Sequence, residues 1–255
     1  MDRYISFSGG VESTTMCLLY GDKAKAIFCD TGFEHAALYR HIERVENELK
    51  KIHPEFELIR VRGDVKVNGK NVDSLYEYIL KSKYYPSPLS RYCTRMFKIE
   101  PIDNFLKDAG ECELMIGLNA EEGERVGNHG NMVNIKYSYP LLENGINRAS
   151  CIKLLKKVDL YPSYPAYMSR GGCVGCFFKS KKEFKAMAAM NPQEFDNVMY
   201  LEEAIQDERG KYFRIRKNMP RLRELKAETQ NTLFKPEEMY LTEDIFTPCG
   251  VFCHR

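Results

Sequence analysis

The chain of 255 residues lacks the features that mark several classes of protein. It has no apolar run near the ~20 residues that a membrane-spanning helix needs, and no charged, apolar and small-residue signal sequence at its start. Lys plus Arg number 38 against 36 Asp plus Glu, so the chain lacks the basic excess of a dedicated nucleic-acid binder. We therefore expect a cytoplasmic protein with no membrane partner, in which any nucleic-acid contact comes from a local patch.

The composition also excludes disordered, collagen-like and coiled-coil chains, since 44% of the residues are apolar and 29% are charged. The nine cysteines lack the regular short spacings of a disulfide framework. In a reducing compartment, clustered cysteines more often serve metal or redox chemistry than disulfides.

Strand and helix patterns alternate over the first sixty residues, which predicts parallel strands joined by helices. We expect strands over 4–7, 26–29, 56–61, 114–117 and 132–139, and helices over 12–20, 35–51, 72–82 and 94–107. Polar loops are expected after Gly63. The predicted fold is a doubly wound α/β domain over 1–145 with a mainly parallel five-stranded sheet. A helical, cysteine-bearing region over 146–255 follows, and the alternative fold is a mixed sheet in which 132–139 forms an antiparallel edge.

A glycine-rich loop, Ser8-Gly9-Gly10-Val11-Glu12-Ser13, lies between the first strand and the first helix. Backbone N–H groups at a helix N-terminus bind anionic oxygens, glycines let phosphates approach the main chain, and the two serine hydroxyls can donate further hydrogen bonds. The loop is neither a Walker loop nor a dinucleotide fingerprint, because it lacks Gly-Lys-Ser/Thr and a third glycine. The alternative is a tight turn with a serine cap.

Four cysteines in the second half of the chain lie in two close pairs, which suggests metal or redox chemistry. Cys173 and Cys176 form a Cys-x-x-Cys flanked by glycines, and Cys249 and Cys253 lie near the C-terminus. Thiolates of this kind suit a [4Fe–4S] cluster or a structural zinc, and a redox dithiol or plain packing stays open. A further four, in apolar strand or helix contexts, are assigned to the core: Cys17, Cys29, Cys112 and Cys151.

The glycine loop resembles the PP-loop of N-type ATP pyrophosphatases, usually Ser-Gly-Gly-x-Asp-Ser, with Glu12 where Asp is usual. Three later segments resemble the phosphoadenosine phosphosulfate (PAPS) reductase-like branch of that superfamily. They are Asp30-Thr31-Gly32, Cys93 to Ile102, and Gly117 to Arg125, in which Asn119 and Gly123 replace the branch's Arg and Ser. Members split ATP into AMP and pyrophosphate, usually adenylating a substrate.

The resemblance implies roles for individual residues. Ser8, Gly9, Gly10, Glu12 and Ser13 would bind ATP with Mg²⁺. Lys98 and Arg125 could neutralise phosphate or sulfate oxygens, and Asp30 and Glu122 could hold a cation or a ribose hydroxyl. The alternative interpretation makes these last four surface charges.

The resemblance also links Cys93 to the cysteine pair. Its separation of 80 residues from Cys173 is similar to that in iron–sulfur sulfonucleotide reductases, although Tyr92 stands in place of a first cysteine. Cys249-Gly250 is similar to the tail that carries their nucleophilic cysteine, with Pro248 replacing Glu. Three alternatives stay open for this tail. Cys249 or Cys253 is the fourth ligand of the metal group, Cys249 is the nucleophile, or the tail is disordered.

Three functional hypotheses follow. The first is an adenylating ATP pyrophosphatase linked to sulfur transfer, which the intact loop favours because the reductases of the family have usually altered it. The second is a PAPS or adenosine phosphosulfate reductase using Cys249, and the third is a non-catalytic nucleotide-binding module stapled by zinc. The acceptor is a tRNA base, a DNA backbone or a small molecule, and a homodimer is possible.

Two other features have a simple structural interpretation. The basic, partly aromatic segments 211–217 and 221–226 could hold a nucleic-acid backbone or form a solvated helix face. The five histidines form no ligand pair at helical spacing, so we expect ordinary surface or helix residues.

Overall fold

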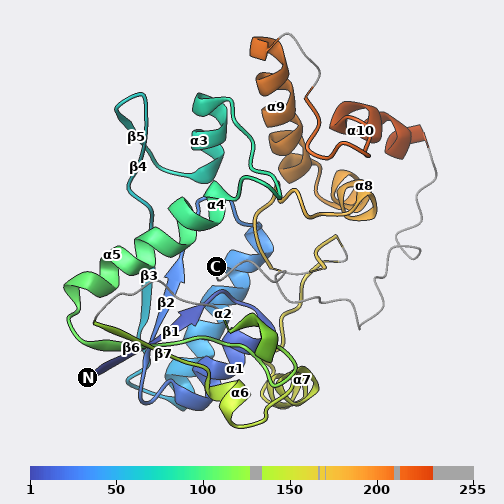
Figure 1. Cartoon of the computed structure of the whole chain (residues 1–255). Coiled ribbons are helices and arrows are strands. Elements are labelled where there is room, and N and C mark those ends of the chain that lie inside the picture. Colours follow the sequence, from blue (N-terminus) through green and yellow to red (C-terminus); the bar gives the residue numbers. More distant parts are fainter. Residues whose placement is uncertain (127–133, 166, 170, 210–212, 232–255) are drawn as a thin grey trace.

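The computed structural model describes residues 1–126, 134–165, 167–169, 171–209 and 213–231 (Figure 1). Cys249 and Cys253 lie outside the described residues, as does part of the predicted basic segment, 211–212. Within the described ranges no helix is both long enough and apolar enough to cross a bilayer.

A five-stranded sheet forms the centre of the structure, in the order β3-β2-β1-β6-β7. Its strands are β1 (Asp2–Phe7), β2 (Lys25–Cys29), β3 (Leu58–Val61), β6 (Cys112–Met115) and β7 (Ile135–Ser138). All four strand pairings are parallel, including β6 with β7. The doubly wound α/β fold is therefore confirmed, and the alternative of an antiparallel edge is wrong.

Helices cover both faces of this sheet (Figure 1). One face packs against α1 (Val11–Tyr20), α2 (Ala36–Ile52) and α7 (Arg148–Lys157), and α5 (Glu100–Asp108) covers the other. Successive residues of β1 serve opposite faces, since Ile5 belongs to the first core and Tyr4 to the second. The four cysteines assigned to the core are buried, which confirms that prediction.

A further hydrophobic core lies beyond the sheet. It joins the hairpin β4 (Val65–Val67) and β5 (Lys70–Val72) to α3 (Leu75–Ser82), α8 (Lys181–Met190), α9 (Pro192–Arg209) and α10 (Leu222–Asn231). Phe184 and Phe195 are fully buried within it. The described part of the C-terminal region contains helices as expected, while the domain boundary after residue 145 stays a prediction.

Two segments differ from the sequence-based expectation. The polar stretch after Gly63 contains the β4–β5 hairpin, whose turn residues Asn68 and Gly69 both have positive φ, as a two-residue type I′ turn requires. The expected helix over 94–107 is divided into α4 (Tyr92–Thr94), a π-helical turn over Arg95–Ile99, and α5. Pro101 lacks an N–H to donate and lies in the first turn of α5, where a proline is tolerated.

The core around α9 gives a stability prediction with a control on the same helix. Phe195→Ala removes a fully buried ring and should lower the free energy of unfolding by about 3–5 kcal/mol. Tyr200→Ala alters a side chain that is 54% exposed and should change it by no more than about 0.5 kcal/mol. Urea unfolding of both variants measures the two values, and equal values would contradict the described packing.

Candidate functional site

The glycine loop turns sharply between β1 and α1. The Oγ of Ser13 accepts a hydrogen bond from the Ser8 N–H (3.2 Å), donates to the Gly10 carbonyl (3.3 Å), and lies 3.2 Å from the Ser8 Oγ. Gly9 has φ +73°, and a Cβ there would lie 2.7 Å from Leu38 Cδ1. The turn therefore requires glycine at position 9, and both serine hydroxyls lie on the loop.

Gly10 precedes the first turn of α1 and makes no side-chain cap. A Cβ built on Gly10 would meet only Ser8 Oγ at 3.5 Å and Ser13 Oγ at 4.0 Å, both ordinary contacts. The fold thus tolerates a side chain at this position, and a side chain would occupy the space in front of the helix N-terminus. An open helix N-terminus of this kind, with free space before its backbone N–H groups, binds anionic oxygens in other proteins.

The loop lies at the point where the strand order of the sheet reverses. β1 pairs with β2 on one side and with β6 on the other, so the connections after β1 and β6 leave the sheet in opposite directions. Ligands of open α/β sheets bind outside the carboxyl ends of the strands at such a point. A Cβ on Gly117, which follows β6, would lie 3.2 Å from Ser13 N, so the two segments approach closely.

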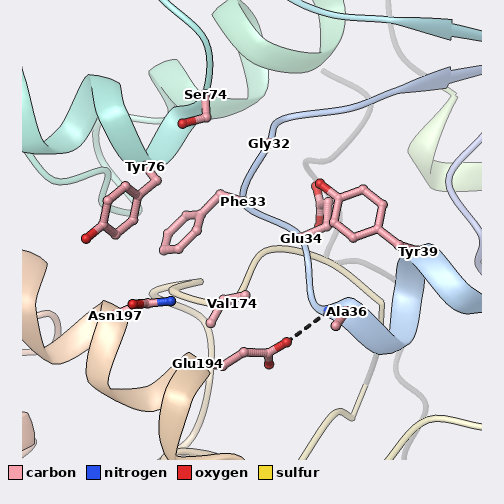
Figure 2. Close-up of a pocket in the computed structure, with 10 residues that line it drawn as sticks. All are labelled: Gly32, Phe33, Glu34, Ala36, Tyr39, Ser74, Tyr76, Val174, Glu194 and Asn197. Carbon is pink, nitrogen blue, oxygen red and sulfur yellow. Dashed lines mark hydrogen bonds between the residues drawn. The ribbon is translucent and has the colours of Figure 1, made fainter.

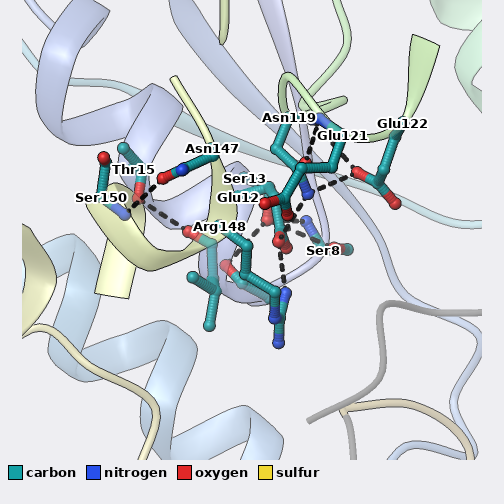
Figure 3. Close-up of polar contacts among 12 residues, drawn as sticks. Ser8, Glu12, Ser13, Thr15, Asn119, Glu121, Glu122, Asn147, Arg148 and Ser150 are labelled. Carbon is teal, nitrogen blue, oxygen red and sulfur yellow. Dashed lines mark hydrogen bonds and ion pairs between the residues drawn. The ribbon is translucent and has the colours of Figure 1, made fainter. Parts of the chain in front are cut away.

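A polar network crosses this point (Figure 3). Glu12 is buried in the first turn of α1, where it forms an ion pair with Arg148 of α7. Its Oε1 also lies 3.4 Å from Asn119 Nδ2, and the same amide donates to Glu122 Oε2 at 2.9 Å. Glu122 in turn pairs with Arg125. The structure thus joins Glu12, Glu122 and Arg125, which the sequence analysis expected to share a site.

Asn119 and Arg148 were not among the predicted site residues. Asn119 was noted only as a departure from the family pattern, yet its amide connects two carboxylates and is 1% exposed. Arg148 lies at the start of α7, outside every recognised motif, and only the folded chain brings it to the loop. No spacing in the sequence would have found it.

Asp30 follows β2 and is held by three partners. It accepts hydrogen bonds from the Tyr39 hydroxyl (2.6 Å), from the Gly32 N–H (2.8 Å) and from the Arg62 guanidinium. Burial raises the pKa of Asp30, but the hydrogen bonds from Tyr39, Gly32 and Arg62 outweigh burial, and the pKa is lowered overall. Asp30 is therefore a carboxylate with a structural role in this turn, and its predicted contact with a nucleotide stays a prediction.

Lys98 lies among thiols, in the π-helical turn that follows α4. Its Nζ is 3.7 Å from Oε1 of Glu34, a carboxylate that is almost completely buried. The Lys98 charge lowers the pKa of Cys29, Cys93 and Cys173, although burial dominates and raises all three. Among the described contacts, Lys98 thus belongs to the cysteine region, whereas Arg125 belongs to the network beside the glycine loop.

The three predicted cysteine ligands influence one another electrostatically. Burial raises the pKa of the Cys173 thiol well above its usual value, and the charges of Glu34, Cys176 and Cys93 raise it further. The Cys173 Sγ also donates to Glu34 Oε1 at 3.5 Å. Cys176 N–H donates to the Cys173 carbonyl at 3.2 Å, which closes a tight turn between the pair.

Cysteine thiolates are the usual ligands of iron–sulfur clusters and of structural zinc, so these three residues suit either group by their chemistry. Among the described residues, no group of three or more His, Cys, Asp or Glu side chains is placed to hold a metal ion. The expected fourth ligand, Cys249 or Cys253, lies outside those residues. The [4Fe–4S] cluster and the zinc alternative both stay predictions.

Tyr164 connects the two regions. Its hydroxyl donates to the Gly9 carbonyl at 2.9 Å. A Cβ on Gly171, two residues before Cys173 in the cysteine loop, would lie 3.0 Å from the Tyr164 hydroxyl oxygen. The glycine loop and the cysteine loop therefore share a buried contact.

Two histidines are buried, although His41 lies in a helix as the sequence analysis allowed. His35 and His41 are 0% and 5% exposed, so they are not ordinary surface residues. His35 Nδ1 pairs with Glu194 of α9, whose other oxygen accepts from the Ala36 N–H at 2.9 Å and so caps α2. Burial lowers the pKa of His35, and the Glu194 hydrogen bond opposes that shift without cancelling it.

Glu194 also lines a pocket of about 370 Å³ beside the Asp-Thr-Gly turn. Figure 2 shows Phe33 and Tyr76 on one side of this pocket, with Val174 and Asn197 opposite. None of these side chains belongs to the predicted site.

Comparison with models of known protein families gives a match over residues 3–140, more than half of the chain, to the phosphoadenosine phosphosulfate reductase domain. The chain belongs to this family. The matched range runs from the second residue of β1 to the start of α6 (Pro140–Glu143), so it contains the glycine loop, Cys93 and all of the sheet except Asp2. The PAPS reductase-like resemblance of the sequence motifs is therefore confirmed, and the family is one of enzymes.

Among solved structures, the chain is similar to phosphoadenylyl-sulfate (PAPS) reductase from Candida auris, crystallised as a phosphate complex. The identity is 16%, the match covers 64% of this chain and 75% of that chain, and the TM-score is 0.47. No curated protein matches the sequence.

The Glu12–Arg148 pair gives a prediction about coupling across the network. Glu12→Gln and Arg148→Met should each destabilise the protein, because each leaves a largely buried partner uncompensated. The double variant should be less destabilised than the sum of the single variants, with a coupling energy of roughly 0.5–3 kcal/mol. Urea unfolding of the four proteins measures it, and strictly additive effects would show that the pair does not interact.

Proposed function

We propose that this member of the PAPS reductase domain family binds ATP at the glycine loop and cleaves it to AMP and pyrophosphate, adenylating an acceptor. The observation that carries the proposal is the space in front of Gly10, where the N-terminus of α1 is bordered by the Ser8 and Ser13 hydroxyls. Phosphate oxygens accept hydrogen bonds from such groups. The phosphates of ATP would therefore lie at the reversal point of the sheet.

The residues of the network suit the chemistry of this reaction. A nucleophilic atom of the acceptor forms a bond to the α-phosphorus, the bond to the bridging oxygen breaks, and pyrophosphate leaves with the electron pair. The loop N–H groups and the cations Arg148 and Arg125 would stabilise the negative charge that develops. Glu12 and Glu122 carry the carboxylate oxygens that Mg²⁺ prefers, so they would hold this ion with the phosphates.

The cysteine region would serve the sulfur chemistry. Cys93, Cys173 and Cys176 would ligate a [4Fe–4S] cluster, with Cys249 or Cys253 as the fourth ligand, and zinc is the alternative. When bound, the cluster would supply a site for sulfur or electron transfer. Thiols of this kind stay reduced in the cytoplasm, where we place the enzyme.

The second candidate is a reductase of PAPS or adenosine phosphosulfate. Here the Cys249 thiolate would attack the sulfur of the bound sulfonucleotide and displace the nucleotide, and a dithiol reductant such as thioredoxin would then release sulfite. The family comparison favours this candidate over the first, because the matching family is named for that reductase. A zinc-stapled binding module and a homodimer stay predictions.

One experiment separates the two enzymatic candidates. Anaerobically purified protein is incubated with ATP, Mg²⁺ and candidate acceptors (tRNA, DNA and small molecules), and in parallel with PAPS and reduced thioredoxin. We expect AMP and pyrophosphate in the first reaction and no sulfite in the second. Gly10→Val fills the space before α1 and Ser13→Ala removes a donor, so both should lower the affinity for ATP, measured by calorimetry, while circular dichroism stays unchanged.

Sulfite release that disappears in Cys249→Ser but survives in Cys253→Ser, at unchanged iron content, would make the reductase correct. Unchanged ATP affinity in both Gly10→Val and Ser13→Ala would remove the loop from the site.

The cysteine region gives a separate prediction. Anaerobically purified protein should be brown, absorb broadly near 400 nm and contain about four irons per chain, as a [4Fe–4S] cluster does. Cys173→Ser and Cys176→Ser should bleach it, whereas Cys151→Ser, which alters a core cysteine, should not. A colourless protein with one tightly bound zinc would instead support the stapled module.

A further inference from the structure

We propose that the acceptor is a single-stranded nucleic acid, bound on an aromatic and cationic surface beside the cysteines. We call this surface the aromatic patch and define it as Tyr84, Arg91, Tyr92 and Phe178. The inference rests on the first proposed function, because it names the class of molecule that would be adenylated or thiolated.

The patch presents rings to solvent. Tyr84 is 42% exposed and stacks on Tyr92 with ring centroids 5.5 Å apart and an interplanar angle of 27°. Tyr92 also contacts Tyr78, with ring centroids 5.1 Å apart, so its ring touches two others. Phe178 is 37% exposed, and the Arg91 guanidinium carbon lies 5.7 Å from its ring centroid. Flat, exposed rings beside a guanidinium are the groups on which unpaired bases stack.

The segment that carries most of the patch has charges of one sign. Between residues 78 and 99 the chain carries cations and no acidic residue. These cations are Lys81, Lys83, Arg91, Arg95 and Lys98. Lys81, Arg95 and Lys98 have carboxylate partners just outside this segment or elsewhere in the chain, which are Glu77, Glu100 and Glu34.

A second cationic segment adjoins the first. Phe213 contacts Tyr85, with ring centroids 5.6 Å apart, and Arg216 donates to the Lys179 carbonyl at 2.7 Å, directly after Phe178. These contacts bring the exposed Arg214 and Lys217 to the same region, again with no acidic residue in 213–217. Two cationic segments around exposed rings match a chain of phosphates that carries unpaired bases.

The patch also borders the cysteines. Tyr92 precedes Cys93 in the chain, and Phe178 lies two residues after Cys176. The Tyr85 hydroxyl donates to the Gly175 carbonyl at 2.6 Å, which fixes the first segment to the cysteine loop. A base stacked on the patch would therefore lie next to the proposed sulfur-transfer centre.

The test measures binding of fluorescein-labelled oligo-uridine and oligo-thymidine, about twenty nucleotides long, to the full chain by fluorescence anisotropy without ATP. We expect saturable binding that weakens as salt rises. Tyr84→Ala and Phe178→Ala should each weaken binding about tenfold, within the range for the loss of one stacked base. Arg91→Gln and Arg214→Gln should each reduce the slope of log affinity against log salt by about 0.7.

The matched controls are Tyr200→Ala, an exposed tyrosine on α9, and Lys153→Gln, an exposed lysine on α7, neither of which should change binding. Circular dichroism checks the fold of each variant, and the two aromatic variants test the patch independently. No binding by the wild-type chain, equal loss in Tyr200→Ala, or tighter binding to phosphatidylglycerol vesicles than to either oligonucleotide would overturn the proposal. Oligonucleotide binding without ATP cleavage would instead refute the proposed function and leave the surface assigned.

Discussion

The parallel pairing of β1 with β2 and β6 is the constraint on which the candidate site depends. The register pairs Ile5 with Met115, so the chain leaves β1 and β6 at nearly the same level of the sheet. Because Gly117 has no side chain, the segment after β6 can pack closely against the backbone of Ser13, where a Cβ on Gly117 would lie only 3.2 Å from the Ser13 nitrogen. Glu12 and Asn119, 107 residues apart in the chain, meet only because of this alignment.

Two chemically different regions are combined around that edge. The glycine loop offers N–H groups and hydroxyls to an anion, while the cysteine loop carries Cys173, whose thiol pKa is raised by burial. The Tyr164 hydroxyl contacts the glycine loop and lies close to Gly171 of the cysteine loop. A substitution at Tyr164 would therefore disturb both regions. An enzyme that activates an acceptor and then transfers sulfur needs its nucleotide site and its thiols to lie close together.

Local patterns predicted most of the fold, because most strands are short apolar runs and several turns, such as those at Gly9, Gly32 and Gly117, contain a glycine. They missed the β4–β5 hairpin, although Asn68-Gly69 is a strong turn signal, because the flanking strands have only three residues each. In the candidate site, the glycine loop and the cysteines were recognisable as motifs. The ion pair of Arg148 and the burial of His35 arise from tertiary packing, which leaves no periodic signal in the sequence.

The central claim is that a nucleotide binds at the glycine loop, and amide chemical shifts measured by NMR during an ATP titration test it most directly. The account predicts the largest shifts at the N–H groups of Gly9, Gly10 and Ser13, with smaller shifts at Gly117 and Asn119 across the reversal point. Gly10→Val should abolish them at the same ATP concentration. Shifts confined to the pocket beside Phe33 and Tyr76, with the loop amides unchanged, would contradict the account.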